Sequence, residues 1–284
     1  METPHPDRTA ATALSAWSFG PRRRFALRRA KLRRLKLSRA GSAALVAVGI
    51  ALPAPLVYQL TVGDQEARQE GAVTTAELQR SWHSDAPSTP APARSVAPGA
   101  SPAAVPPVAS ASAPRPVPSY PAHYPLGQAF AVLHVPAIGL DTAIAEGTDQ
   151  GPVLDRGLVG HYAGTLQSAY PWQGSGNTAL AAHRTTHGAP FRRLDELKPG
   201  DEAVVETEQE FFVYRITGGI EEVSPSEVGV VAPVPAGSGF RGPGRYLTLT
   251  TCTPEYSSRG RLIRFGVLVR TVARADQPTG LPGL

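Results

Sequence analysis

The chain has one cysteine among its 284 residues, Cys252, so an intramolecular disulfide is excluded. In an exported protein, a lone cysteine is either a small buried hydrophobic residue or a free reactive thiol. Charge is likewise absent from residues 40–63, a run that as a helix would be about 36 Å long. That length is enough to cross a bilayer with some tilt. The sequence therefore predicts one transmembrane helix at residues 40–63.

Positive charge before this run predicts its orientation. Residues 21–39 carry ten Lys or Arg, and such a cluster beside a first span favours a cytoplasmic N-terminus. A cleaved signal peptide and a buried core helix are the alternatives. Because 39 residues precede the run and no A-x-A site directly follows it, a retained anchor is favoured. We therefore expect a single-pass membrane protein with residues 1–39 inside and everything after about Asp64 outside.

The sequence pI of about 9.6 does not indicate a nucleic-acid partner. Residues 1–39 contribute +9 to the net charge of +5, which leaves −4 for the rest of the chain. The basicity is thus local and describes membrane topology and contact with anionic lipid.

Composition changes twice after the predicted span. Residues 64–84 are polar and fit a short juxtamembrane helix. Residues 87–125 hold 12 of the 29 prolines among Ala and Ser, and such a stretch cannot bury enough apolar surface to fold. We interpret residues 64–126 as a juxtamembrane segment and a disordered Pro/Ala-rich stalk. A Pro-rich recognition segment for a partner is the alternative.

Residues 127–273 have the usual size of one domain and a strand-like pattern nearly throughout. Short runs rich in β-branched and aromatic residues, such as "AFAVLHVPAI", "GNTALAAHR" and "RYLTLTTC", alternate with turn residues. Only "GAPFRRLDEL" indicates a helical turn. The pattern predicts an all-β barrel or sandwich, followed by a C-terminal tail at residues 274–284.

Cys252 is predicted to end one strand of this domain. Along "YLTLTTC", the cysteine falls on the less apolar face, and the following "TPEYSSRG" is a loop of turn formers. If the flanking strands pair as a hairpin, Arg261 at the start of the second lies beside the thiol. A guanidinium favours a thiolate and donates hydrogen bonds to an oxyanion. Without the nearby cysteine, Arg261 would be interpreted as a solvent-exposed charge at the end of a strand.

A thiol nucleophile needs a proton partner, usually histidine. Four of the seven histidines fall in the domain: His134, His161, His183 and His187. His183 ends the apolar strand "NTALAAH", as Cys252 ends its own, so both are expected at one rim of a barrel. "HRTTH" does not fit the zincin motif, because Arg184 stands where that motif has Glu. We expect no metal and no cofactor.

These segments resemble the sortases, membrane-anchored cysteine transpeptidases of Gram-positive bacteria. "TLTTC" with Arg261 is similar to the T-L-x-T-C motif and downstream arginine of that family, and "NTALAAHR" to its histidine strand. "GLVGHYAGT", "AAHRTTHGAPFRRLDELKPGD" and "TCTPEYSSRGRLI" look most like class E sortases of actinobacteria. Two positions depart from the family pattern: Ala182 replaces a usual Gly, and His187 replaces a residue that is often aromatic.

The resemblance implies a closed barrel of about eight strands with short helical turns. It also implies a catalytic triad of Cys252, His183 and Arg261, with Thr251 and Thr253 shaping a substrate or oxyanion pocket. The expected reaction cleaves an LAxTG- or LPxTG-like sorting signal of an exported protein between Thr and Gly. A thioacyl intermediate then passes to an amine of a peptidoglycan precursor or stem peptide.

Three alternatives remain open at this point. A pilin-polymerising sortase would join subunits through lysine, and a cysteine hydrolase would use water as acceptor. A non-catalytic binding module would hold Cys252 as a core residue and show no thiol reactivity.

Overall fold

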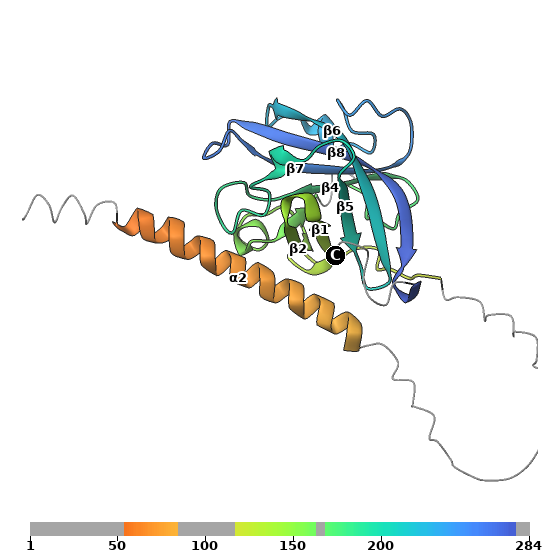
Figure 1. Cartoon of the computed structure of the whole chain (residues 1–284), viewed down its shortest axis with the longest axis horizontal. Helices are drawn as coiled ribbons and strands as arrows, with labels where there is room; N and C mark the ends of the chain where they lie inside the picture. Colours follow the sequence, from red (N-terminus) through yellow and green to blue (C-terminus); the bar gives the residue numbers. More distant parts are fainter. Residues whose placement is uncertain (1–53, 85–116, 163–167, 277–284) are drawn as a thin grey trace, which may run out of the picture. The chain divides into compact units, whose positions relative to one another are not determined.

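A computed structural model of the chain describes residues 54–84, 117–162 and 168–276 (Figure 1). Its eight β-strands close into a barrel in the order β1-β2-β3-β4-β7-β8-β6-β5. The strands are β1 (Ala129–Val135), β2 (Leu140–Glu146), β3 (Val159–His161), β4 (Gly176–Ala181), β5 (Glu202–Glu206), β6 (Glu210–Val223), β7 (Arg245–Thr253) and β8 (Gly260–Ala273). The predicted all-β barrel of about eight strands is therefore confirmed.

Short 3-10 helices punctuate the barrel, as the resemblance implied. They are η1 (Pro136–Ile138), η2 (Leu154–Arg156), η4 (Leu194–Glu196), η5 (Val228–Val231) and η6 (Arg274–Asp276). The predicted helical turn in "GAPFRRLDEL" corresponds to η4. Strand β3 was not predicted, because three residues are too few for an alternating pattern to show.

Apolar residues at alternating positions along the strands fill the interior of the barrel. Leu247 and Leu249 of β7 are fully buried in the interior cluster together with Leu180 of β4. Thr248 lies on the opposite face of β7, where its hydroxyl donates a hydrogen bond to the carbonyl of Val230, 3.2 Å away in η5. Strand β7 is thus covered on both faces, which fixes the position of its C-terminal end.

Strand β7 lies between β4 and β8, which differ in direction relative to it (Figure 1). It pairs in parallel with β4, far away in the sequence, and antiparallel with β8, which follows directly. The β7–β8 pair is the predicted hairpin. Because β4 and β7 run in the same direction, both strands end at the same rim of the barrel.

Helix α2 (Ala54–Ser84) precedes the barrel. It covers the predicted juxtamembrane helix and begins inside the predicted span, most of which lies outside the described residues. In the described parts of the chain, no helix combines the length and apolar character needed to cross a membrane. The transmembrane helix at residues 40–63 remains a prediction.

The side of α2 that faces the barrel consists of small residues four positions apart. Ala67, Gly71 and Thr75 are all buried. The Thr75 hydroxyl accepts a hydrogen bond from the amide of Ala143 in β2 at 2.8 Å. A Cβ atom added to Gly157 would lie 2.4 Å from the carbonyl oxygen of Ala67. The helix therefore contacts the barrel with its backbone, and only glycine fits at position 157.

The segment before β1 also packs on the barrel. The ring of Tyr120 stacks on Trp172 with centroids 4.2 Å apart, and its hydroxyl donates a hydrogen bond to Glu210 at 2.9 Å. Tyr124 stacks on Phe130 at 4.8 Å. The sequence placed these two tyrosines in the linker, because the surrounding prolines and alanines dominate the local composition.

Candidate active site

The parallel register of β4 and β7 brings the predicted histidine to the predicted thiol. Ala181 is the partner of Thr250, and the amide of Ala182 donates a hydrogen bond to the Thr250 carbonyl at 3.3 Å. Continuing this register two residues further places His183 level with Cys252. Matched residues of parallel strands emerge on the same face of the sheet. Both side chains therefore leave the barrel at one rim, as the sequence predicted.

The antiparallel register of β7 and β8 places the predicted arginine on the other side of the thiol. Cys252 is the direct partner of Arg261. The Arg261 guanidinium donates hydrogen bonds to the carbonyls of Ser258 at 3.0 Å and Gly260 at 2.9 Å. These loop contacts hold the arginine at the strand end. Cys252 thus lies on the central strand β7, between β4, which leads directly into His183, and β8, which carries Arg261.

Cys252 is a free, partly exposed cysteine, and its two sequence neighbours are buried. The Thr251 hydroxyl donates a hydrogen bond to the carbonyl of Ala182 at 2.8 Å, which ties the end of β7 to the residue before His183. The Thr253 hydroxyl accepts a hydrogen bond from Arg184 at 3.0 Å. Both threonines therefore use their hydroxyls to fix the backbone around the thiol.

The nearest charged partner of His183 was missed in the sequence. Nε2 of His183 lies 2.8 Å from Oδ1 of Asp155 in η2, and Nδ1 of His187 lies 3.5 Å from the same oxygen. The two imidazole rings stack with centroids 4.9 Å apart. Asp155 lies in the undistinguished stretch "VLDRG", 28 residues before His183, so no local pattern could have indicated it.

The other two candidate histidines lie in buried structural networks. His134 pairs with Glu206 at 2.7 Å, and His161 pairs with Glu146 at 3.0 Å. Burial lowers the pKa of His134, but its hydrogen bonds to Glu206 and to Asp141 outweigh burial and raise the pKa overall. Both histidines belong to the walls of the barrel.

Three further arginines near the hairpin are engaged with acidic residues. Arg184 lies 3.3 Å from Asp195, and the buried Arg264 lies 3.0 Å from Glu221. Arg259 is exposed and lies 3.2 Å from Glu222. By register, Arg261 is the one directly opposite Cys252 in the sheet.

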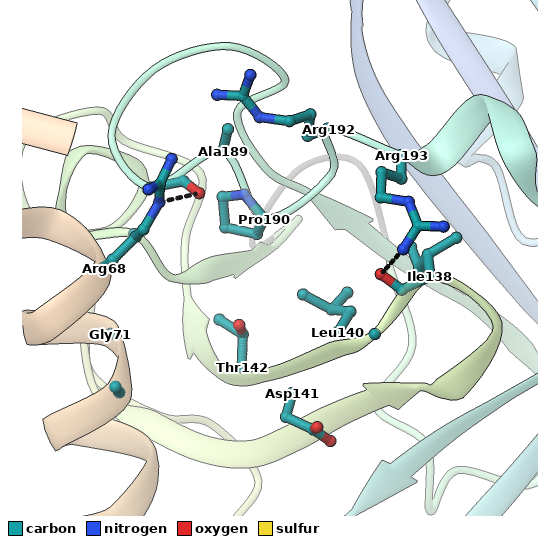
Figure 2. A pocket seen from close by; sticks show the side chains of 14 residues that line it. Arg68, Gly71, Ile138, Leu140, Asp141, Thr142, Ala189, Pro190, Arg192 and Arg193 are labelled. Carbon is teal, nitrogen blue, oxygen red and sulfur yellow. Dashed lines mark hydrogen bonds between the residues drawn. The ribbon is translucent and has the colours of Figure 1, made fainter. Parts of the chain in front are cut away.

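A pocket of about 390 Å³ opens between α2, the β1–β2 connection and the loop after His187. Figure 2 shows Arg68 of α2 and Arg193 of the loop at its edges, each donating a hydrogen bond to a backbone carbonyl. Cys252, His183 and Arg261 do not line this pocket. The strand register, and not the pocket, therefore marks the candidate active site.

Comparison with known proteins identifies the family of the barrel domain. The family model described as "Sortase domain" matches residues 133–269. Sortase SrtE1 of Streptomyces coelicolor is 50% identical over 156 residues, which are 55% of this chain and 44% of that protein. Sortase SrtE2 of the same organism is 39% identical over 140 residues, 49% of this chain and 55% of that protein. The chain thus spans about half the length of these curated relatives.

A solved structure covers the same region. The crystal structure of sortase E1 from Streptomyces coelicolor with a tripeptide in the active site is 50% identical, with a TM-score of 0.53. The match covers 55% of this chain and 95% of that chain. With this identity over nearly the whole of a solved relative, the chain belongs to the sortase family of cysteine transpeptidases.

Proposed function

We propose that this chain is a sortase that cleaves an LAxTG- or LPxTG-like sorting signal between Thr and Gly and joins the Thr carbonyl to an amine. The observation that carries the proposal is the position of Cys252 between the strand ends of His183 and Arg261. Family membership supports the reaction class. The sorting signal and the acceptor are expectations from the class E resemblance.

In the proposed mechanism, the Cys252 thiolate attacks the Thr carbonyl and forms a tetrahedral oxyanion. The oxyanion collapses to a thioester as protonated His183 gives its proton to the leaving Gly amine. His183 then takes a proton from the incoming amine, which attacks the thioester and releases the Cys252 thiolate.

Arg261 would stabilise the oxyanion, because it is the cross-strand partner of Cys252, and directly opposed residues of antiparallel strands project on the same face of the sheet. The hydrogen bonds to Ser258 and Gly260 hold its stem in place. Asp155 would orient the His183 ring and stabilise its protonated form, as the carboxylate does in other nucleophile–histidine–acid triads.

We also propose that the protein is anchored in the cell membrane by residues 40–63, with a cytoplasmic N-terminus and an extracellular barrel. Its partners would be exported proteins that carry a sorting signal and peptidoglycan precursors or stem peptides. The basic residues 21–39 and the uncharged run support this topology. Protease protection in right-side-out membrane vesicles tests this topology. Protease added outside should cleave the barrel domain and leave residues 1–39 protected.

The reaction is tested with the full chain in detergent, a Leu-Ala-x-Thr-Gly peptide and an amine acceptor, read by mass spectrometry. We expect a new amide between the Thr carbonyl and the acceptor, absent with Cys252→Ala. Hydrolysis alone would contradict the transpeptidase and favour the hydrolase. If neither product nor a thioacyl adduct forms with any sorting-signal peptide, the non-catalytic binding module is correct.

A further inference from the structure

Three potential metal ligands converge where η2 meets the loop that follows β4. One ligand atom from each of Asp155, His183 and His187 can be chosen so that all three lie within 4.8 Å of one another. The carboxylate oxygen is 2.8 Å from Nε2 of His183 and 3.5 Å from Nδ1 of His187. Ligands around one tetrahedral zinc at about 2.0 Å lie about 3.3 Å apart, so small rotations of these side chains would complete the set.

His187 has a nitrogen that the protein alone does not satisfy. Its Nδ1 is buried and finds no hydrogen-bond partner among the described residues, although the side chain as a whole is 40% exposed. The ring is held against His183 by stacking at 4.9 Å. A nitrogen that is shielded by its neighbours, lacks a hydrogen bond and lies 3.5 Å from a carboxylate oxygen can bind a cation together with that carboxylate.

The two arginines that directly follow the proposed ligands in the sequence do not oppose a positive ion here. The guanidinium of Arg156, the next residue after Asp155, lies 2.6 Å from Glu70 of α2. Arg184, the next residue after His183, donates to Thr253 and lies 3.3 Å from Asp195. Both positive charges are therefore already balanced by carboxylates outside the cluster.

This cluster differs from the zincin pattern that the sequence excludes. In that pattern two histidines lie one turn apart on a helix, whereas His183 and His187 lie in the loop that follows β4. Here the third ligand comes from Asp155 in η2. Two imidazoles and one carboxylate leave a coordination position open, as in catalytic zinc sites.

We propose that Asp155, His183 and His187 form a site for a divalent transition cation of the Zn²⁺ type, and that the bound ion switches the enzyme off. A cation on Nε2 of His183 takes the place of the proton that this nitrogen donates to Asp155. Its positive charge also disfavours protonation of the ring at Nδ1, the nitrogen that is left to exchange protons with the substrate. The cation also removes the Asp155 carboxylate from the ring. The inhibitory part rests on the proposed function, whereas binding itself does not.

Binding is measured first, in the full-length Cys252→Ala chain, so that the thiol cannot contribute. Isothermal titration with ZnCl₂ should show one ion per chain, and Co²⁺ should give the visible absorption of a tetrahedral site. His187→Phe keeps an aromatic ring beside His183 but offers no ligand, and it should weaken binding about tenfold or more. The exposed His123→Ala is the matched control and should bind as the parent does.

Binding that is absent, or that is equally strong in a folded His187→Phe chain, would overturn the site. Circular dichroism establishes folding, and Asp155→Asn provides a second variant that must also weaken binding. Loss of binding in His123→Ala would place the ion elsewhere and overturn the assignment.

Inhibition is measured next, with Cys252 intact. Saturating Zn²⁺ should lower turnover about tenfold or more, and EDTA should restore it. The turnover of each variant with Zn²⁺ is compared with its own metal-free turnover, and the turnover of His187→Phe should no longer fall when Zn²⁺ is added. If Zn²⁺ inhibits His187→Phe as strongly as the parent enzyme, the ion acts on the thiol and the proposed inhibition through this site is wrong. If the metal-free chain has no turnover, the proposed function fails and the binding result still decides the site.

Discussion

The residues around Cys252 divide into those that face the thiol and those that fix its backbone. Arg261 faces it across the β7–β8 pair, whereas Thr251 and Thr253 direct their hydroxyls to Ala182 and Arg184. Substitution of Arg261 should therefore change the rate of the chemical step. Substitution of Thr251 or Thr253 should change the geometry of the strand end.

Arg261→Lys is predicted to lower kcat/KM about 100-fold or more, because lysine cannot reproduce the two-pronged donor at the position of the oxyanion. The fold should be unaffected, since Arg261 lies at the end of a strand. Arg259→Lys is the matched control, because that side chain is 69% exposed and pairs with Glu222. Steady-state kinetics with the sorting peptide measure both. Equal loss in the two variants would contradict the assigned role.

Asp155→Asn is predicted to lower kcat about 100-fold while KM changes less than about twofold. The amide keeps the size of the side chain but cannot stabilise a protonated His183, so transition-state stabilisation is lost and substrate binding is kept. A Glu70→Gln variant, which removes the partner of Arg156 in the same region, serves as the control. A rise in KM with an unchanged kcat would mean that Asp155 acts on substrate binding only.

How far these residues could be predicted depends on the distance along the chain. Cys252 and Arg261 are nine residues apart in one hairpin, so alternation and turn residues were enough to pair them. His183 could be placed only through the expectation that two strands end at one rim. Asp155 reaches His183 through the fold alone, and no periodic pattern records such a contact.

At the scale of elements, α2 supports the region that holds Asp155. Glu70 of α2 pairs with Arg156, and the amide of Gly188 donates a hydrogen bond to Asp64 at 3.3 Å. The helix thus contacts both η2 and the loop that follows His187. The sequence predicted a helix here but not its docking, because a few small residues among charged ones give no amphipathic pattern.

Gly71→Ala is predicted to destabilise the folded protein by about 1 to 3 kcal/mol, because the new Cβ would lie 2.8 Å from the carbonyl oxygen of Gly157. Gly63→Ala is the matched control in the same helix, since nothing lies within 4 Å of its Cβ position. Helix propensity alone should make that control more stable by about 0.5 to 1 kcal/mol. Urea unfolding measures both. Stabilisation by Gly71→Ala would show that α2 does not dock.

At the scale of the whole molecule, one charged network joins α2, β1, β5 and the C-terminal η6. Glu206 of β5 accepts hydrogen bonds from Gln79 at 2.8 Å and Arg274 at 2.7 Å, and it pairs with His134. Burial raises the pKa of Glu206, but these hydrogen bonds outweigh burial and lower the pKa to about 2.

This network predicts a stability maximum at mildly acidic pH. Glu206, with its lowered pKa, contributes stability above about 4.5, and the contribution is lost as the pH falls toward about 2. His134, with its raised pKa, contributes fully below 6.5, and the contribution is lost as the pH rises through the folded-state value. The contribution of the pair is therefore largest between these limits.

His134→Gln should flatten the alkaline side of this profile, because glutamine donates a hydrogen bond but does not titrate. We expect its free energy of unfolding to lie about 1 to 3 kcal/mol below that of the parent at pH 6, with a smaller gap at pH 9. Urea unfolding at both pH values measures this, with His123→Gln as control. A gap that does not depend on pH would contradict a charged His134.

Both flanks of residues 85–116 lie at one place on the barrel. The guanidinium of Arg274 lies 5.0 Å from the ring of Trp82, and the amide of Ser119 donates a hydrogen bond to Gln209 at 3.0 Å. Trp82 and Ser119 line the same pocket of about 180 Å³. The described segments before and after residues 85–116 therefore contact the same part of the barrel.

Removing residues 91–110 should then stabilise the docked helix by about 1 kcal/mol, because a shorter loop loses less entropy on closure. The free energy of unfolding in urea tests this. An unchanged value would indicate that α2 is not held against the barrel.

A spacer moves a domain away from its membrane anchor only when the two ends of the spacer lie far apart. Among the side chains that the structure describes, Asp64, one residue after the predicted span, already contacts the barrel, so under the proposed topology the Pro/Ala-rich stretch would not set the height of the enzyme above the membrane. The thiol would stay close to the lipid headgroups whatever the length of that stretch. Such an enzyme would meet its substrates while they are still held at the membrane surface, before they enter the wall.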